Sequence, residues 1–183
     1  PLWFTPMSPV LFLSSAIAAG LSMVVFESIF ASWSFKRPIE MNCLAPLGRI
    51  IPVTLGIYLA LKIGDMVIRE SYVHLLEFST ESVMFFVEML VGVVLPFGLL
   101  FSSSIRERPS TLFLSAVMVV GGLAINRINV FLVAYSPPFA EKTYVPAIGE
   151  IAITAMLISI IVLAYRYVVL NFPVLEADNN NEE

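Results

Sequence analysis

Charged residues are scarce in this chain. They make up 13% of the 183 residues, whereas 58% are hydrophobic; soluble domains carry about 25% charged and roughly 45–50% apolar residues. The mean hydropathy is +0.91. A core of this size cannot hide so much apolar surface, so lipid must solvate a large part of it. The composition therefore excludes a soluble enzyme.

Metal-binding side chains are also scarce. The chain has one cysteine, Cys43, and one histidine, His74, which we expect in a loop. An iron–sulfur cluster needs about four thiolates, and a bis-histidine haem needs two imidazoles. We therefore expect no metal and no redox cofactor bound within this chain.

The chain has no excess of positive charge, so we do not expect it to bind nucleic acid. Ten basic residues stand against 14 acidic ones, the net charge is −4, and no basic tract occurs. A nucleic-acid partner would require a basic patch. The first residue is Pro1 rather than an initiator methionine, and we expect the sequence to be the interior of a longer chain or a processed product.

Long uncharged runs predict an all-α membrane protein with about five transmembrane helices in a bundle. A helix needs roughly 20 residues to cross the hydrocarbon layer. Prolines near the starts of the first, fourth and fifth runs fit helix openings, and Pro96 should kink the third helix. The predicted helices lie at about 8–33, 46–70, 80–104, 110–135 and 146–171, giving a transmembrane domain of residues 1–171 and an acidic, polar tail of residues 172–183.

Positive charge predicts the orientation of these helices. Lys36, Arg37 and Arg49 follow the first helix, and Arg106 and Arg108 follow the third. Such residues concentrate on the cytoplasmic side. We therefore expect the N-terminal end outside and the C-terminal end in the cytoplasm, in a prokaryotic inner membrane.

Several ionisable and amide side chains fall inside the predicted spans. Charges at this depth cost several kcal/mol unless they are paired or hydrated. Tyr58, Lys62, Asp65 and Arg69 share one stripe of the second helix because they stand at positions i, i+4, i+7 and i+11. Together, the charged residues of this stripe and the ionisable and amide residues of the other predicted helices indicate one buried network. Its members are Lys62, Asp65, Arg69, Glu81, Glu88, Asn126, Arg127, Asn129 and Glu150.

Two interpretations of this network stay open. The charges can be interhelical pairs that fix the packing, or they can form a proton path through part of the membrane. Glu27, on the first helix near the inner side, is either the inner end of such a path or a side chain that reaches the interface from the helix end.

Three stretches carry a family resemblance. Residues 5–20, TPMSPVLFLSSAIAAG, resemble the start of the second helical bundle in NrfD-like proteins. Leu61–Asp65 followed by Arg69 resembles the next helix. Residues 126–130, NRINV, and 144–150, YVPAIGE, are similar to the family's Asn-Arg-x-Asn and Tyr-x-Pro-Ser-x-x-Glu signatures, with Ala147 in place of serine. The likeness spans about residues 2–170 and is closest to the HybB branch, the cytochrome b-like subunits of nickel–iron hydrogenase.

The resemblance implies a membrane subunit that exchanges electrons between the quinone pool, menaquinone or ubiquinone, and a ferredoxin-like iron–sulfur partner subunit. Full-length relatives have eight to ten helices, no haem, and a quinone pocket mainly in the first bundle. This chain would supply the second bundle and one further helix. The resemblance assigns Asp65, Arg69, Asn126, Arg127, Asn129 and Glu150 to the polar network or proton path of that bundle.

Two other functions remain open at this stage. The chain can be an anchor without a catalytic role that only docks soluble subunits. It can also be half of a secondary transporter, for which substrate-dependent flux into liposomes would be decisive.

Overall fold

The computed structural model describes residues 5–76, 79–133 and 146–172. Within these ranges every regular element is helical, and five helices are long and apolar enough to cross a membrane. They confirm the predicted all-α membrane protein. The chain divides into two units, residues 1–140 and 141–183, which are described separately.

The first unit opens with two long helices. Helix α1 spans Ser8–Ser34 with Pro9 in its first turn, and α2 spans Met41–Ile68. The second helix begins five residues before the predicted position 46. Pro46 and Pro52 both lie inside this helix, and each lacks the N–H group that would donate to the carbonyl four residues earlier.

The third span is interrupted by a wider turn. Helix α4 covers Thr80–Met89, a π-helix η1 covers Leu90–Val94, and α5 covers Leu95–Phe101. The Leu95 N–H donates to the Leu90 carbonyl, which is the i→i+5 pattern of a π turn. Pro96 is the second residue after the π turn, close to where the sequence predicts a kink.

The remaining elements of this unit are short connectors and one long helix. Helix α3, Val73–Leu76, contains His74, so this residue lies in a helical turn and not in the predicted loop. Helix α6 spans Ser103–Arg106, α7 spans Pro109–Ile128, and a second π-helix, η2, spans Asn129–Val133. The predicted connection at 136–145 falls outside the described residues.

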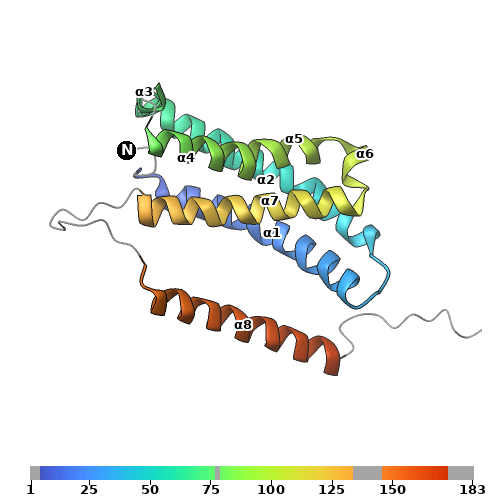
Figure 1. Ribbon diagram of the computed structural model, residues 1–183. Helices are drawn as coiled ribbons and strands as arrows, with labels where there is room; N and C mark the ends of the chain where they lie inside the picture. The colour runs from blue at the N-terminus through green and yellow to red at the C-terminus, as the bar shows by residue number, and fades with distance from the viewer. Residues whose placement is uncertain (1–4, 77–78, 134–145, 173–183) are drawn as a thin grey trace, which may run out of the picture. The chain divides into compact units, whose positions relative to one another are not determined.

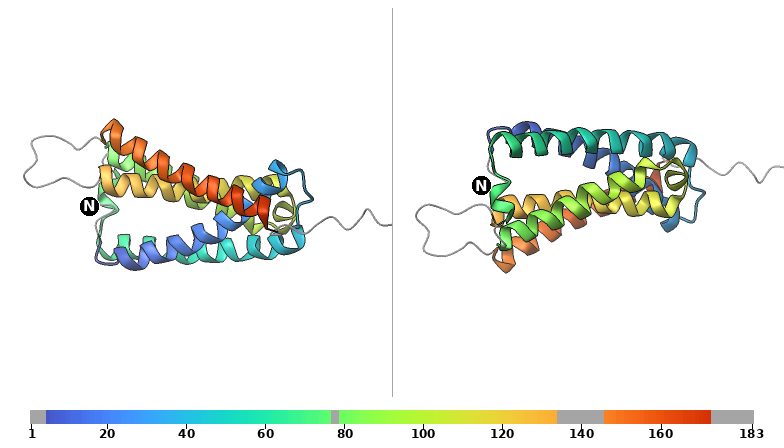
Figure 2. Two further views of the ribbon diagram at one scale, coloured as in Figure 1. Left: turned by 90° about the horizontal axis from the view of Figure 1, so that it is seen from below. Right: turned by 90° about the horizontal axis from the view of Figure 1, so that it is seen from above.

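The four spans of the first unit run side by side with alternating direction (Figures 1 and 2). Helix α1 packs against both α2 and α7, η1 packs against α7, and α5 packs against both α2 and α7. Their shared core is apolar toward the end where α1 finishes and α2 begins. It includes Val25, Ile29, Ile51, Leu100 and Leu112, each at most 1% exposed.

The second unit contains helix α8, Ile148–Asn171. It begins shortly after Pro146, as expected for a helix opening, and carries Glu150 in its first turn. Its side chains are mostly aliphatic, including Ile151, Leu157 and Ile161, which suits a helix surrounded by lipid.

Candidate functional site

A buried carboxylate lies near the middle of the first unit. Glu88 of α4 is 2% exposed. Its Oε1 accepts a hydrogen bond from Asn126 Nδ2 at 2.6 Å, and its Oε2 accepts one from Asn129 Nδ2 at 3.0 Å. Each carboxylate oxygen is therefore held by an amide donor, which offsets part of the cost of burying a charge.

Lys62 supplies the opposite charge. Its Nζ lies 3.5 Å from Glu88 Oε1 and 3.4 Å from the Tyr58 hydroxyl, and the side chain is nearly buried. Both distances exceed the usual 2.7–3.2 Å of a hydrogen bond. The ammonium also lies 5.2 Å from the centre of the Phe85 ring. The lysine is thus loosely held between an anion, a hydroxyl and an aromatic face. We call Tyr58, Lys62, Glu88, Asn126 and Asn129 the Glu88 cluster.

A close approach of two backbones fixes the register of the Glu88 cluster. A Cβ atom added to Gly92 of η1 would lie 2.6 Å from the Gly122 Cα atom of α7, so only glycine fits on both sides. The two helices run in opposite directions. Glu88 stands four residues before Gly92, and Asn126 stands four residues after Gly122, so the glycine contact places carboxylate and amide opposite each other.

Both π-helices border the same cluster. Glu88 lies two residues before η1, and Asn129 is the first residue of η2. A π turn widens a helix by one residue and changes the direction of the side chains that flank it, and such turns are frequent at functional sites.

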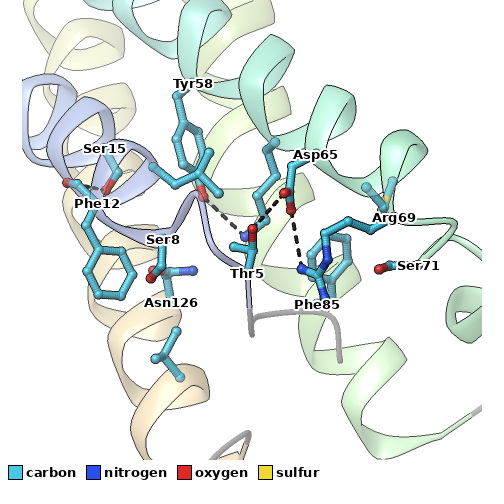
Figure 3. Close-up of a pocket in the computed structure, with 14 residues that line it drawn as sticks. Thr5, Ser8, Phe12, Ser15, Tyr58, Asp65, Arg69, Ser71, Phe85 and Asn126 are labelled. Atoms are coloured by element: carbon cyan, nitrogen blue, oxygen red, sulfur yellow. Dashed lines mark hydrogen bonds and ion pairs between the residues drawn. The ribbon is translucent and has the colours of Figure 1, made fainter.

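A second polar group lies toward the end of the bundle where α1 begins. Asp65 Oδ1 accepts a hydrogen bond from the Thr5 hydroxyl at 2.6 Å, and Asp65 Oδ2 lies 3.6 Å from Arg69 Nη1 (Figure 3). The aspartate and arginine are only partly buried. This group therefore stands between the Glu88 cluster and the bundle end.

Two small cavities connect these groups. The first lies between the starts of α1 and α4 and the ends of α2 and α7, and Figure 3 shows Thr5, Tyr58, Asp65 and Arg69 around it. The second lies deeper, beside Glu88 and the Gly92–Gly122 contact. Ser15, Tyr58 and Asn126 line both cavities, so the two spaces adjoin.

The remaining predicted residues lie apart from the Glu88 cluster. The Arg127 guanidinium stacks 3.7 Å from the centre of the Phe12 ring, and its Nη1 atom is buried without a hydrogen-bond partner in the described structure. Glu81 is half-buried in the first turn of α4, and Glu27 is exposed on α1. Glu150 is exposed within the second unit.

Several contributors were absent from the predicted site. Thr5 and Phe85 contact the charged groups, yet a threonine before a helix and a phenylalanine in an apolar run give no signal in one sequence. Tyr58 was visible on the Lys62 stripe because of its spacing. The two π turns and the glycine contact depend on tertiary packing.

The described residues offer little to a metal ion. They hold no group of three or more His, Cys, Asp or Glu side chains that could share one. The chemistry available to the Glu88 cluster is hydrogen bonding and proton exchange by a carboxylate, an ammonium and a phenol.

Comparison with known proteins identifies several proteins that are similar to this chain. The chain is 30% identical over 184 residues to a protein of Nitratidesulfovibrio vulgaris, covering 96% of this chain and 47% of that protein. It is 30% identical over 190 residues to an Escherichia coli protein with the provisional name Ni/Fe-hydrogenase 2 b-type cytochrome subunit, covering 100% of this chain and 48% of the relative.

A third relative comes from Halobacterium salinarum and is provisionally named as a membrane subunit of dimethyl sulfoxide reductase. The identity is 24% over 188 residues, covering 86% of this chain and 43% of the relative. The chain thus spans about half the length of the relatives it matches. No solved structure matches it.

The family assignment rests on most of the first unit. Residues 1–138, which contain all four of its spans and the complete Glu88 cluster, match the polysulphide reductase NrfD family. The five apolar helices agree with a multi-pass membrane protein. The chain therefore belongs to the polysulphide reductase NrfD family.

Proposed function

We propose that this chain is part of the membrane subunit of a respiratory oxidoreductase, linking the membrane quinone pool to an iron–sulfur partner subunit. Family membership and the names of two relatives, a hydrogenase subunit and a dimethyl sulfoxide reductase membrane subunit, support this assignment. In this proposal the partner carries the redox centres and the helices described here contribute a buried charged site.

The residues of this chain do not fit a bis-histidine haem, although one relative is named a b-type cytochrome subunit. His74 is the single histidine, and it lies in the four-residue helix α3 outside the long spans. A bis-histidine haem would need two imidazoles, and this chain supplies one.

The observation that carries the proposal is the burial of Glu88 among groups that can exchange protons. A quinone takes up or releases protons whenever it is reduced or oxidised, so its partner protein needs groups that carry them. Glu88 can bind a proton, while Lys62 and Tyr58 can donate or accept one. We assign Glu88 as a proton-binding group of the complex.

A purely structural role is the competing interpretation. Buried ion pairs fix helix arrangement even when their net stabilisation is small. Lys62 lines the first cavity and Glu88 lines the second. This favours the functional role, because proton exchange needs a space that water can enter, whereas a packing pair does not.

A substitution at Glu88 tests this role. In the native complex, Glu88→Gln keeps the size and one acceptor oxygen, and Asn129 can rotate its amide to match the new side chain. We expect the complex to assemble at its normal level while quinone-linked turnover falls by about tenfold or more, because general acid–base groups contribute at least this much.

Glu27→Gln is the matched control, since Glu27 is exposed on α1 and its substitution removes the same charge. Turnover and proton release in this variant should equal those of the unaltered complex. Equal turnover in the Glu88→Gln and Glu27→Gln complexes would leave the packing role as the explanation of the Glu88 cluster.

A further inference from the structure

We infer that the two adjoining cavities form a blind aqueous channel, open at the bundle end where α1 begins and closed beyond Glu88. This inference goes beyond the proposed function, since access of water to the site can be measured whatever reaction the complex catalyses. The occupant is water, together with hydronium or other small cations that move with it.

The size of the cavities suits water. Each cavity leaves about 20 Å³ for the centres of water molecules, and one ordered water needs roughly 10–15 Å³. A buried water also needs two to four polar partners. Asp65, Arg69 and Lys62 line the first cavity, and Glu88 lines the second.

The long contacts inside the Glu88 cluster support the same occupant. Lys62 Nζ has three protons to donate, but its contacts with Tyr58 and Glu88 are 3.4 and 3.5 Å. The ammonium lines the first cavity. Water in that cavity would complete the hydrogen bonds of a charge that the protein alone holds loosely.

The open end lies at the membrane boundary. Thr5 precedes α1, and Arg69 and Ser71 follow the last residues of α2; all three line the first cavity. Figure 3 shows Thr5 beside Asp65 and Arg69, whereas Ser15 and Tyr58 also line the second cavity. With the orientation that the positive charges predict, this end faces the outside.

The closed end consists of packed apolar side chains. Beyond the Gly92–Gly122 contact lie Val25, Ile51 and Leu112, each at most 1% exposed. Leu112 packs directly against the α2 backbone: a Cβ atom on Gly48 would lie 2.8 Å from its Cδ1 atom. The groove at the far end of the bundle, beside Arg49 and Glu107, shares no lining residue with either cavity.

The consequence concerns the direction of proton exchange. Glu88 can equilibrate with the face at which α1 begins, whereas an apolar layer separates it from the opposite face. A proton that reaches Glu88 therefore leaves by the same end unless the helices rearrange.

Three serines on one face of α1 give a direct test. Ser8, Ser15 and Ser22 are spaced seven residues apart; Ser8 lines the first cavity, Ser15 lines both, and Ser22 is fully buried and lines neither. Each is replaced by cysteine in a background carrying Cys43→Ser, which removes the chain's single native thiol. Serine and cysteine differ by one atom, so the packing is conserved.

The probe is Ag⁺, which is close to water in size and reacts with thiolates. It is added to one face of sealed membrane vesicles that contain the native complex, and the thiols left unreacted are then labelled with a maleimide in detergent. We expect Ag⁺ to block Ser8→Cys and Ser15→Cys from one face only, and the same face for both. Ser22→Cys should stay unblocked from either face.

Other labelling patterns would overturn the inference. A dry cavity would leave Ser15→Cys unblocked, and a continuous channel would let Ag⁺ block it from both faces or reach Ser22→Cys. Hydroxyl-radical labelling of the unaltered complex provides a second measurement. Met66, which lines the first cavity, should be oxidised there, and full protection of Met66 would equally contradict a water-filled space.

Discussion

At the scale of single residues, the Glu88 cluster combines a charge pair with two amide donors. Glu88 is bound at both oxygens by Asn126 and Asn129, and Lys62 balances its charge from a longer distance. Removing one partner of a buried pair leaves an uncompensated charge, which costs about 3–5 kcal/mol, whereas removing both costs much less.

This asymmetry gives a prediction for Lys62. The Lys62→Met variant should lose about 3 kcal/mol of stability, because Glu88 then stays buried without its counter-charge. The double variant Lys62→Met with Glu88→Gln should recover most of this loss. Unfolding of the purified protein in detergent, followed by circular dichroism, measures all three stabilities. Equal losses in the single and double variants would show that the two charges are not coupled.

At the scale of helices, the contact between η1 and α7 holds the cluster in register. Gly122 faces the Gly92 backbone so closely that no side chain fits between them, whereas its neighbour Gly121 has open space around it. Substitution of these two adjacent glycines therefore distinguishes the effect of the close backbone contact on stability from the effect of helix propensity.

A pair of alanine substitutions uses this difference. Gly122→Ala should destabilise the bundle by about 1–3 kcal/mol, since the added methyl group must push α7 away from η1. Gly121→Ala should be neutral or slightly stabilising, because alanine favours a helix over glycine. Thermal unfolding of both variants in the same detergent gives the comparison. A Gly122→Ala protein as stable as the Gly121→Ala protein would contradict the close contact.

The end of α2 offers an independent prediction. Glu70 has a φ of 54°, a left-handed conformation that suits glycine, and the next N–H, from Ser71, donates to the Met66 carbonyl at 3.0 Å. This is a Schellman-type helix end with a glutamate at the usual glycine position.

Relief of this backbone strain should stabilise the protein. Glu70→Gly is expected to raise stability by about 1 kcal/mol, while Glu70→Ala, which loses the same charge and keeps the Cβ atom, should not. Glu70 is exposed, so neither change disturbs the core. The difference between the two midpoints of thermal unfolding isolates the backbone effect, and equal midpoints would refute it.

The elements were predictable from sequence to different extents. Long apolar runs bounded by proline and charge identified five spans, because crossing a membrane imposes length and composition directly. The spacing of Lys62 and Asp65 also placed both on one stripe of α2, where they line the same cavity. Spacing alone could not separate Glu81 from Glu88. They share a helix face, but Glu81 lies in the first turn of α4, whereas Glu88 lies two turns further along and accepts a hydrogen bond from Asn126.

The pairing across helices could not be read from one sequence. Which residue of α7 faces Glu88 depends on the register of two antiparallel helices, and the Gly92–Gly122 contact and the two π turns set that register. Glycine occurs at nine positions of this chain, and nothing local distinguishes the two that touch.

At the scale of the whole molecule, the first unit is a four-span bundle with two unlike halves. The half that contains the ends of α2 and α7 holds the buried charged residues Lys62 and Glu88 and the two adjoining cavities, whereas the interior of the other half is an apolar core. Helix α8 forms the second unit with its own acidic residue, Glu150. The relatives that this chain matches are about twice as long.

Purification of the native complex in mild detergent tests whether this chain belongs to a quinone-linked respiratory complex. The composition is read by mass spectrometry of all co-purifying chains, by electron paramagnetic resonance for iron–sulfur clusters, and by extraction of bound quinone. We expect an iron–sulfur subunit and a quinone in the same particle as this chain. Isolation of a cofactor-free homo-oligomer would contradict this expectation and would favour a transporter.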